Sequence, residues 1–103
     1  MEQKTLDKVK NIINNEKVQN AFYNLYDRWE DENRYEDLNE YGKCIMNAIH
    51  KNVPESGAKL VKTTNSPFGI IFNVDNVDFH LYVKVNGGYL VLSCKLSKTL
   101  LYG

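Results

Sequence analysis

The residues most able to do chemistry lie in an acidic block between Asp27 and Tyr41. This block holds seven of the thirteen acidic residues, the only Trp and both Arg residues of the chain. Two carboxylates could act as a general acid and a base, but a glycosidase pair must face each other across a cleft. The spacing of the acids also differs from that of a calcium-binding EF-hand loop. We therefore expect neither catalysis nor a metal site here, and we interpret the block as a surface of negative charge.

An acidic surface of this kind suits a basic protein partner, because carboxylates on a rigid helix can imitate a track of phosphates. The predicted contact residues are Asp27, Trp29, Glu30, Asp31, Glu32, Arg34, Tyr35, Glu36, Asp37 and Glu40. The rings among them would add binding energy if they are partly exposed. The alternative is that the acids coat a solvated helix face and that Trp29 and Tyr41 belong to the core.

Other residue types with chemical potential are sparse. His50 and His80 are the only histidines, and His80 is expected near Ser93, but a pair without an orienting acid is no catalytic triad. Cys44 and Cys94 form no CxxC and no metal-site spacing, so we expect both to be buried thiols in a reducing compartment. Dinucleotide-binding, P-loop and zinc-protease motifs are missing from the sequence. We expect no enzyme, no cofactor and no metal.

Charge is distributed unevenly along a chain whose formal net charge is zero. Residues 27–40 carry seven acids against two Arg, whereas residues 41–103 carry seven Lys against three acids. This balance disfavours a globally basic nucleic-acid-binding protein, and nucleic acid is not the expected partner. The first residues lack the apolar region of a signal peptide, and no apolar run reaches membrane-spanning length. We expect a cytoplasmic protein without membrane contact.

Apolar residues at helical spacing predict the elements that carry the acidic block. Three helices are predicted, at residues 4–14, 16–33 and 36–51, and the last two could form one kinked helix. Acids in the first turns of the third helix suit the helix dipole. Gly42 inside that helix costs about 1 kcal/mol relative to Ala, so we expect another element to pack closely against it.

Beyond residues 53–57 the apolar period changes from helical to alternating. Strands are predicted at residues 60–63, 69–74, 77–85 and 89–96, with a turn at residues 64–67. A turn at Asp75-Asn76 pairs Phe72 with Phe79. A hairpin loop at Asn86-Gly87 pairs Leu81 with Leu92, whereas a loop at Gly87-Gly88 would shift the pairs by two residues and keep the same faces.

The strand alternation predicts a core face that the helices cover. Its members are Ile70, Phe72, Val74, Phe79, Leu81, Val83, Leu90, Leu92, Cys94 and Leu96. The fold class is therefore α+β, with two to three N-terminal helices packed on one face of a three- to four-stranded antiparallel meander. We expect one domain over residues 1–103, with a helical half at 1–52 and a β half at 58–102.

The outer sheet face is a second candidate contact. It is predicted to carry Ile71, Asn73, His80, Tyr82, Lys84, Tyr89, Val91, Ser93 and Lys95. Within it, His80, Tyr82, Lys84, Tyr89 and Lys95 would suit base stacking combined with phosphate contact. A dimer contact explains the same face equally well.

Three short segments carry a family resemblance: Arg28–Glu32, Tyr35–Asp37, and Ser66–Gly69 followed by strands. Together they resemble small uncharacterised proteins encoded by phages and prophages of low-GC Gram-positive bacteria, over residues 22–75. The resemblance implies an accessory protein of the host cytoplasm, some of which inhibit host defence, as anti-CRISPR proteins do, or block host enzymes by binding. The zero net charge departs from the strongly acidic balance of many nucleic-acid mimics, so only a local acidic patch is expected.

These observations favour a non-enzymatic, phage-type accessory or inhibitor protein. We expect it to bind a host protein, such as a defence or nucleic-acid-handling enzyme, through its acidic helical surface. The alternatives are a small nucleic-acid-binding module that uses the outer sheet face, and a homodimeric structural phage component.

Overall fold

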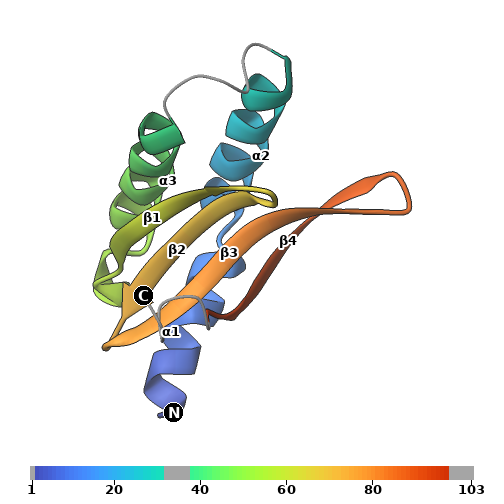
Figure 1. Ribbon diagram of the computed structural model, residues 1–103. Helices are drawn as coiled ribbons and strands as arrows, with labels where there is room; N and C mark the ends of the chain where they lie inside the picture. Colours follow the sequence, from blue (N-terminus) through green and yellow to red (C-terminus); the bar gives the residue numbers. More distant parts are fainter. Residues whose placement is uncertain (1, 32–37, 98–103) are drawn as a thin grey trace.

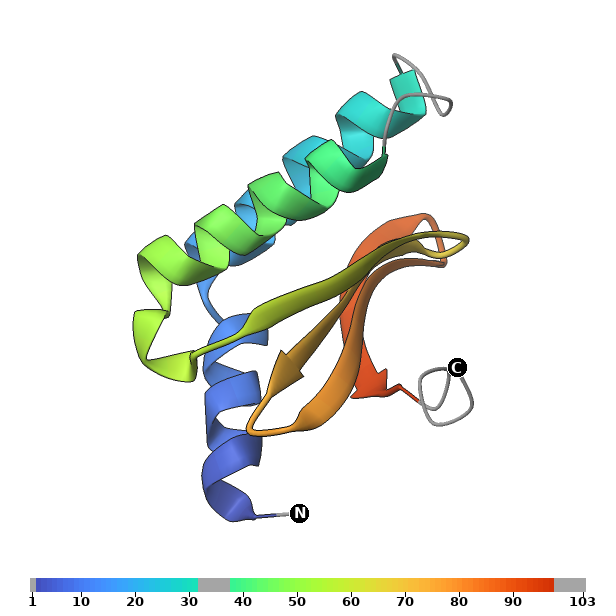
Figure 2. The ribbon, with the colours of Figure 1, turned by 60° about the vertical axis from the view of Figure 1, so that its left-hand side comes forward.

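The chain folds as three helices followed by a four-stranded sheet, within the part that the structure describes. The structure is a computed structural model that describes residues 2–31 and 38–97. The elements are α1 (Gln3–Ile13), α2 (Glu16–Asp31), α3 (Leu38–Asn52), the 3-10 helix η1 (Pro54–Ser56), β1 (Lys59–Asn65), β2 (Phe68–Val74), β3 (Val77–Asn86) and β4 (Tyr89–Leu96). Figures 1 and 2 show the helices gathered on one side of the sheet. The α+β prediction is confirmed.

The sheet is an antiparallel meander in which each strand pairs with the next along the chain. Phe72 lies opposite Phe79, as predicted. The turn between β2 and β3 is Asp75-Asn76, and both residues have positive φ, at 53° and 67°. A two-residue turn with two positive φ angles matches the right-handed twist of a hairpin.

The β3–β4 register is the second of the two that the sequence allowed. Val83 lies opposite Leu92, and Leu81 lies opposite Cys94, which is the pairing expected for a loop at Gly87-Gly88. The loop is Gly87-Gly88, with φ angles of 59° and 86°. Two glycines meet the demand for positive φ at both central positions, which leaves Asn86 free to stay in the strand.

The first strand is longer than the sequence pattern predicted. β1 runs from Lys59 to Asn65, so the predicted turn at residues 64–67 shrinks to Ser66-Pro67. The polar Thr64 and Asn65 resemble turn residues, but β1 is an edge strand of the sheet and tolerates them. The pairing with β2 also shifts between Leu60 and Lys62, as at a β-bulge.

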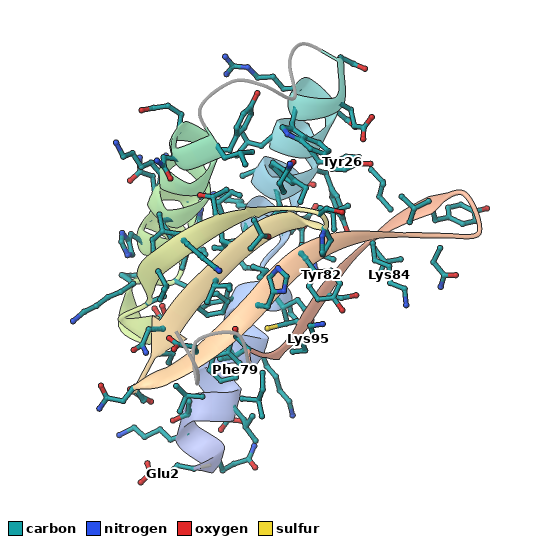
Figure 3. The ribbon with its side chains drawn as sticks, viewed as in Figure 1. Glu2, Tyr26, Phe79, Tyr82, Lys84 and Lys95 are labelled. Carbon is teal, nitrogen blue, oxygen red and sulfur yellow. The ribbon has the colours of Figure 1, made fainter. Side chains whose placement is uncertain are left out.

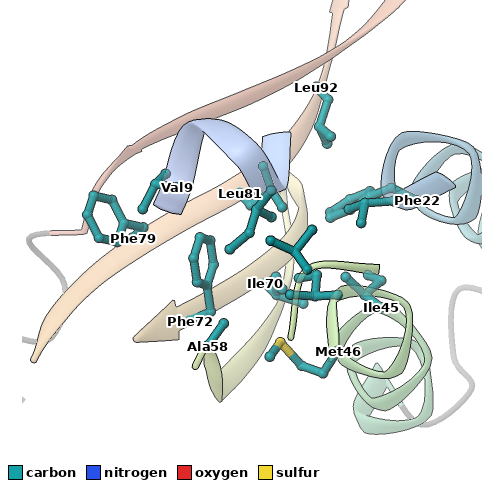
Figure 4. Close-up of a cluster of buried hydrophobic side chains, with 14 of the residues drawn as sticks. Val9, Phe22, Ile45, Met46, Ala58, Ile70, Phe72, Phe79, Leu81 and Leu92 are labelled. Carbon is teal, nitrogen blue, oxygen red and sulfur yellow. The ribbon is translucent and has the colours of Figure 1, made fainter. Parts of the chain in front are cut away.

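The core lies between the sheet and the helices. Of the predicted core face, Ile70, Phe72, Val74, Phe79, Leu81, Val83 and Leu92 are buried. Figure 4 shows Leu81 and Ile70 facing Phe22 of α2 and Ile45 of α3. Leu90 and Cys94 are only half-buried, and Leu96 is 50% exposed. These exceptions all lie on β4, the edge strand whose hairpin extends beyond the helices in Figure 1.

The second and third helices are separate elements that lie side by side (Figure 1). Gly42 of α3 is buried, and a Cβ atom there would overlap the side-chain oxygen of Thr63 and lie 3.3 Å from Cδ2 of Leu60. The expectation of close packing at Gly42 is confirmed, because its missing side chain lets α3 approach β1.

The first helix is attached to the β2–β3 turn by polar contacts. The Thr5 hydroxyl donates a hydrogen bond to Oδ2 of Asp75 at 2.8 Å, and Nζ of Lys8 lies 3.0 Å from Oδ1 of the same carboxylate. The hydrogen bonds from Lys8 and Thr5 hold the pKa of Asp75 below its ordinary value.

None of the helices in residues 2–31 and 38–97 is both long and apolar enough to cross a membrane.

Candidate functional site

The described part of the acidic block lies where α2 ends and α3 begins. Asp27, Glu30 and Asp31 are exposed at the end of α2, and Glu40 is exposed in the first turn of α3. Figure 1 shows these two helix ends next to each other. The predicted contacts Glu32, Arg34, Tyr35, Glu36 and Asp37 lie outside the described residues.

The acids on α2 stand where the helix itself disfavours them. Unpaired carbonyl groups give a helix C-terminus a partial negative charge, so a carboxylate there is destabilising. Asp31 is the last residue of α2 in the described range, and Asp27 stands four positions earlier on the same side. Like charges at this spacing repel each other. Glu40 is different, because the start of a helix favours an acid and Nζ of Lys43 lies 3.7 Å away.

Trp29 supports the acidic end from below and contributes little to its surface. Its side chain is only 8% exposed, and its ring centroid lies 5.1 Å from that of Phe68. Tyr41 is 3% exposed and packs edge-on against the same Phe68 ring. The part of the alternative that places both aromatics in the core is therefore correct, whereas the role of the acids stays a prediction. The helical stripe that carries Trp29 directs it at the sheet.

One aromatic does reach the acidic surface. The half-buried Tyr26 hydroxyl donates a hydrogen bond to Oε1 of Glu30 at 3.2 Å, and its ring lies 5.9 Å from that of Trp29. The ring cluster beneath the acids thus fixes the end of α2 against β2. A fixed helix end presents its carboxylates with less ordering cost on binding than a loop would.

The two cysteines differ, contrary to the expectation that both are buried. Cys44 is exposed, because it lies on the flank of α3 away from the buried Gly42 and Met46. Cys94 is half-buried, and burial raises the pKa of its thiol to about 11. It lines a pocket of about 300 Å³ between α1 and the strands β3 and β4, together with Leu6, Val9, Lys10, Ile13, Phe79, Lys95 and Leu96. At neutral pH Cys94 is therefore a thiol and a poor nucleophile.

The histidines make structural contacts. The Nε2 atom of His50 donates to the backbone carbonyl of Ala58 at 2.7 Å, which links α3 to the start of the sheet. His80 faces Lys95 across the β3–β4 pair instead of Ser93, because of the two-residue shift in register. Within the described ranges, no three His, Cys, Asp or Glu side chains gather closely enough to hold a metal ion.

The outer sheet face brings together three of the five residues that were predicted to contact a nucleic acid. The rings of His80 and Tyr82 lie 4.8 Å apart between centroids, and Nζ of Lys95 lies 5.4 Å from the centroid of Tyr82. Figure 3 shows Lys84 on the hairpin side of Tyr82 and Lys95 toward the other end of the strand. Tyr89 pairs with Asn86 next to the hairpin loop and is 77% exposed.

Three further residues of this face were missed by the sequence analysis, namely Lys62, Thr64 and Gly69. Thr64 of β1 donates to the carbonyl of Pro67 at 2.8 Å, and its oxygen lies 3.0 Å from Nε2 of His80, so that nitrogen carries the hydrogen. Burial, followed by the charges of Lys95 and Lys62, lowers the pKa of His80. Gly69 of β2 lies opposite Tyr82. The predicted strand ended at residue 63, which removed Thr64 from the face.

Comparison with known proteins gives no relative. A scan against protein-family models and searches of curated proteins and of solved structures found no significant match. Function must therefore be argued from the surfaces of the molecule itself.

Proposed function

We propose that the protein is a non-enzymatic accessory protein of the phage type that binds a basic surface of a host protein. The contact is the end of the helical layer, where Asp27, Glu30 and Asp31 of α2 stand beside Glu40 of α3. A basic groove that handles nucleic acid, such as that of a defence enzyme, has the complementary charge.

The observation that carries this proposal is the position of Asp27 and Asp31. Asp31 ends α2, where the helix dipole disfavours an acid, and it stands four residues after a second acid. Exposed positions of this kind are easily occupied by Lys or Arg, which would stabilise the helix. A local arrangement that lowers stability without an evident structural gain is expected at functional surfaces.

The surroundings of these acids favour charge presentation over chemistry. The carboxylates of Asp27, Glu30 and Asp31 are exposed, whereas a catalytic carboxyl group usually owes its raised pKa to burial. The rings of Trp29 and Phe68 hold the helix end in place beneath them. A rigid, hydrated set of negative charges can steer a basic partner into contact and fix its orientation.

Capture of a host protein with matched variants tests the proposal. The test variant carries Asp27→Lys and Asp31→Lys. The control carries Asp7→Lys and Glu55→Lys, which make the same change in net charge at exposed acids on α1 and η1. The three proteins are immobilised at equal density, incubated with host lysate, and the captured proteins are quantified by mass spectrometry.

A partner that follows the proposal is captured by the unmodified protein and by the control but lost with the test variant. Its capture decreases as salt is added, because exposed charge pairs are screened. Duplex DNA should release it, since both ligands would occupy the same basic groove. Equal capture of every specific partner by the two variants would refute the proposal.

A further inference from the structure

The outer face of the sheet forms a second charged surface, separate from the acidic end. Its exposed lysines come from three strands: Lys62 of β1, Lys84 of β3 and Lys95 of β4. Among the described residues that the register places on this face, Asp78, at the start of β3, supplies the carboxylate. Its Oδ1 accepts a hydrogen bond from the Asn73 side chain at 2.9 Å. The exposed charges around this face are therefore mainly positive, whereas its centre holds the buried Ile71 next to His80.

A half-buried aromatic ring lies among these lysines. Tyr82 faces Gly69 on one neighbouring strand and Ser93 on the other. A Cβ atom at Gly69 would come within 2.7 Å of the Cα of Tyr82, so glycine is needed for the strands to approach here. Both lateral neighbours of the ring are thus small, and Tyr82 itself packs closely over Gly69.

Two polar side chains, those of His80 and Lys95, lie close to the Tyr82 ring on one side of it. His80 and Lys95 face each other toward the Leu96 end of β4. The ring side that points to the hairpin has Lys84 as its neighbour along β3 (Figure 3). Tyr89, at the hairpin, adds an exposed ring on the same face.

We propose that this face binds single-stranded nucleic acid. A base stacks on Tyr82 from the hairpin side, and the lysines on β3 and β4 contact the adjoining phosphates. Single strands bind to surfaces that combine a basic track with exposed rings, because every base has a face that can stack. An acidic peptide would use the lysines alone and would leave the rings without a role.

His80 provides a direct readout of such binding. Burial, followed by the charges of Lys95 and Lys62, lowers the pKa of His80, and Thr64 and Tyr82 also face its ring. A phosphate placed between the lysines would offset their charge and favour the protonated imidazole. The His80 signals in an NMR titration should therefore change at higher pH when an oligonucleotide is present.

Fluorescence anisotropy of a labelled twelve-nucleotide oligothymidylate, at about 20 mM salt, is the main experiment. Tyr82→Ala should weaken binding by about five- to 150-fold, which corresponds to the loss of one stacked base. Lys84→Gln with Lys95→Gln should reduce the slope of log Kd against log salt by about 1.4, since each lost phosphate contact on a single strand contributes about 0.7. The control is Lys17→Gln with Lys43→Gln, two exposed lysines of the helices.

The outcomes separate the proposal from its alternatives. Binding by the unmodified protein and the control, together with weakening in both sheet variants, supports it. An oligouridylate probe shows whether RNA is preferred over DNA. No anisotropy change at 100 µM protein, equal binding by Tyr82→Ala, or equally tight binding of polyglutamate would overturn the proposal. Far-UV circular dichroism confirms that each variant is folded. Because this surface is distinct from the acidic end, either proposal can fail without the other.

Discussion

The clearest consequence of the structure is that Asp31 lowers the stability of its own helix. Replacing it by Lys converts an unfavourable charge at the end of α2 into a favourable one. A charge at a helix terminus contributes about 0.3–1 kcal/mol at low ionic strength. Loss of the repulsion from Asp27 adds about 0.2–0.5 kcal/mol. Asp31→Lys should therefore raise the free energy of unfolding by about 1 kcal/mol.

Thermal and urea unfolding followed by circular dichroism will measure this gain. For a domain of 60–100 residues, 1 kcal/mol corresponds to a rise in Tm of about 4–8 °C. The matched control is Glu16→Lys at the first position of the same helix, where the dipole predicts the opposite sign. Both changes should shrink when salt is raised to about 0.5 M, because exposed charges are screened.

An unchanged or lower stability of Asp31→Lys would refute the reasoning. It would mean that the carboxylate makes a favourable local interaction, and the argument that Asp31 is retained for binding would lose its basis. A stabilised variant that still captures the partner would separate the two steps. The helix argument would then hold, and the proposed contact would not.

Three further predictions concern packing, thiol reactivity and pH. Gly42→Ala should destabilise the protein, because its new methyl group overlaps the Thr63 hydroxyl. Such overpacking costs about 1–3 kcal/mol, whereas the gain in helix propensity is about 1 kcal/mol. Adding Thr63→Ala should recover the lost stability in urea unfolding, and a stabilised single variant would contradict this packing. Cys44 should react with a thiol reagent at once in the native protein. Cys94 should react only after denaturant is added, because its thiol is half-buried and has a raised pKa. Fast reaction of both thiols in the native protein would contradict the structure. The NMR titration midpoint of His80 should lie below 6.5. Its contribution to stability should be present above pH 6.5 and be lost as the pH falls below that value, since the unfolded state then binds a proton that the folded state does not. Replacement of His80 by Gln should remove this part of the pH dependence.

The sheet was predictable from the sequence because its core face alternates strictly. Phe79, Leu81 and Val83 point inward whichever residues form the hairpin loop, so the buried face did not depend on the register. The register itself did depend on the loop. Asn86-Gly87 and Gly87-Gly88 both satisfy the turn, and local sequence alone gives no reason to prefer the second.

The positions of surface residues were less predictable, because burial depends on neighbouring elements. A stripe on α2 places Trp29 toward something, but only the Phe68 ring of β2 shows that the indole is covered. Cys44 stands next to the buried Ile45 in sequence yet lies on an exposed flank of α3. The contact between Thr64 and His80 joins residues sixteen positions apart and could not be read from either segment.

Besides Gly42, two features of the described residues break the local rules of their own elements. Core positions follow their helical or alternating period, and the turn residues suit their φ angles, so sequence and structure agree at each level. Asp31 at a helix C-terminus and Gly69 inside a strand do not, since each lowers the intrinsic stability of its own element. The first exposes a carboxylate, and the second lets the strand that carries Tyr82 approach closely. The zero net charge of the chain thus conceals two surfaces of opposite sign, on separate layers of the fold. If Asp31 and Gly69 have purely structural causes, variants of the two surfaces should bind ligands as well as their matched controls do. Loss of ligand binding in a surface variant but not in its matched control would contradict that explanation.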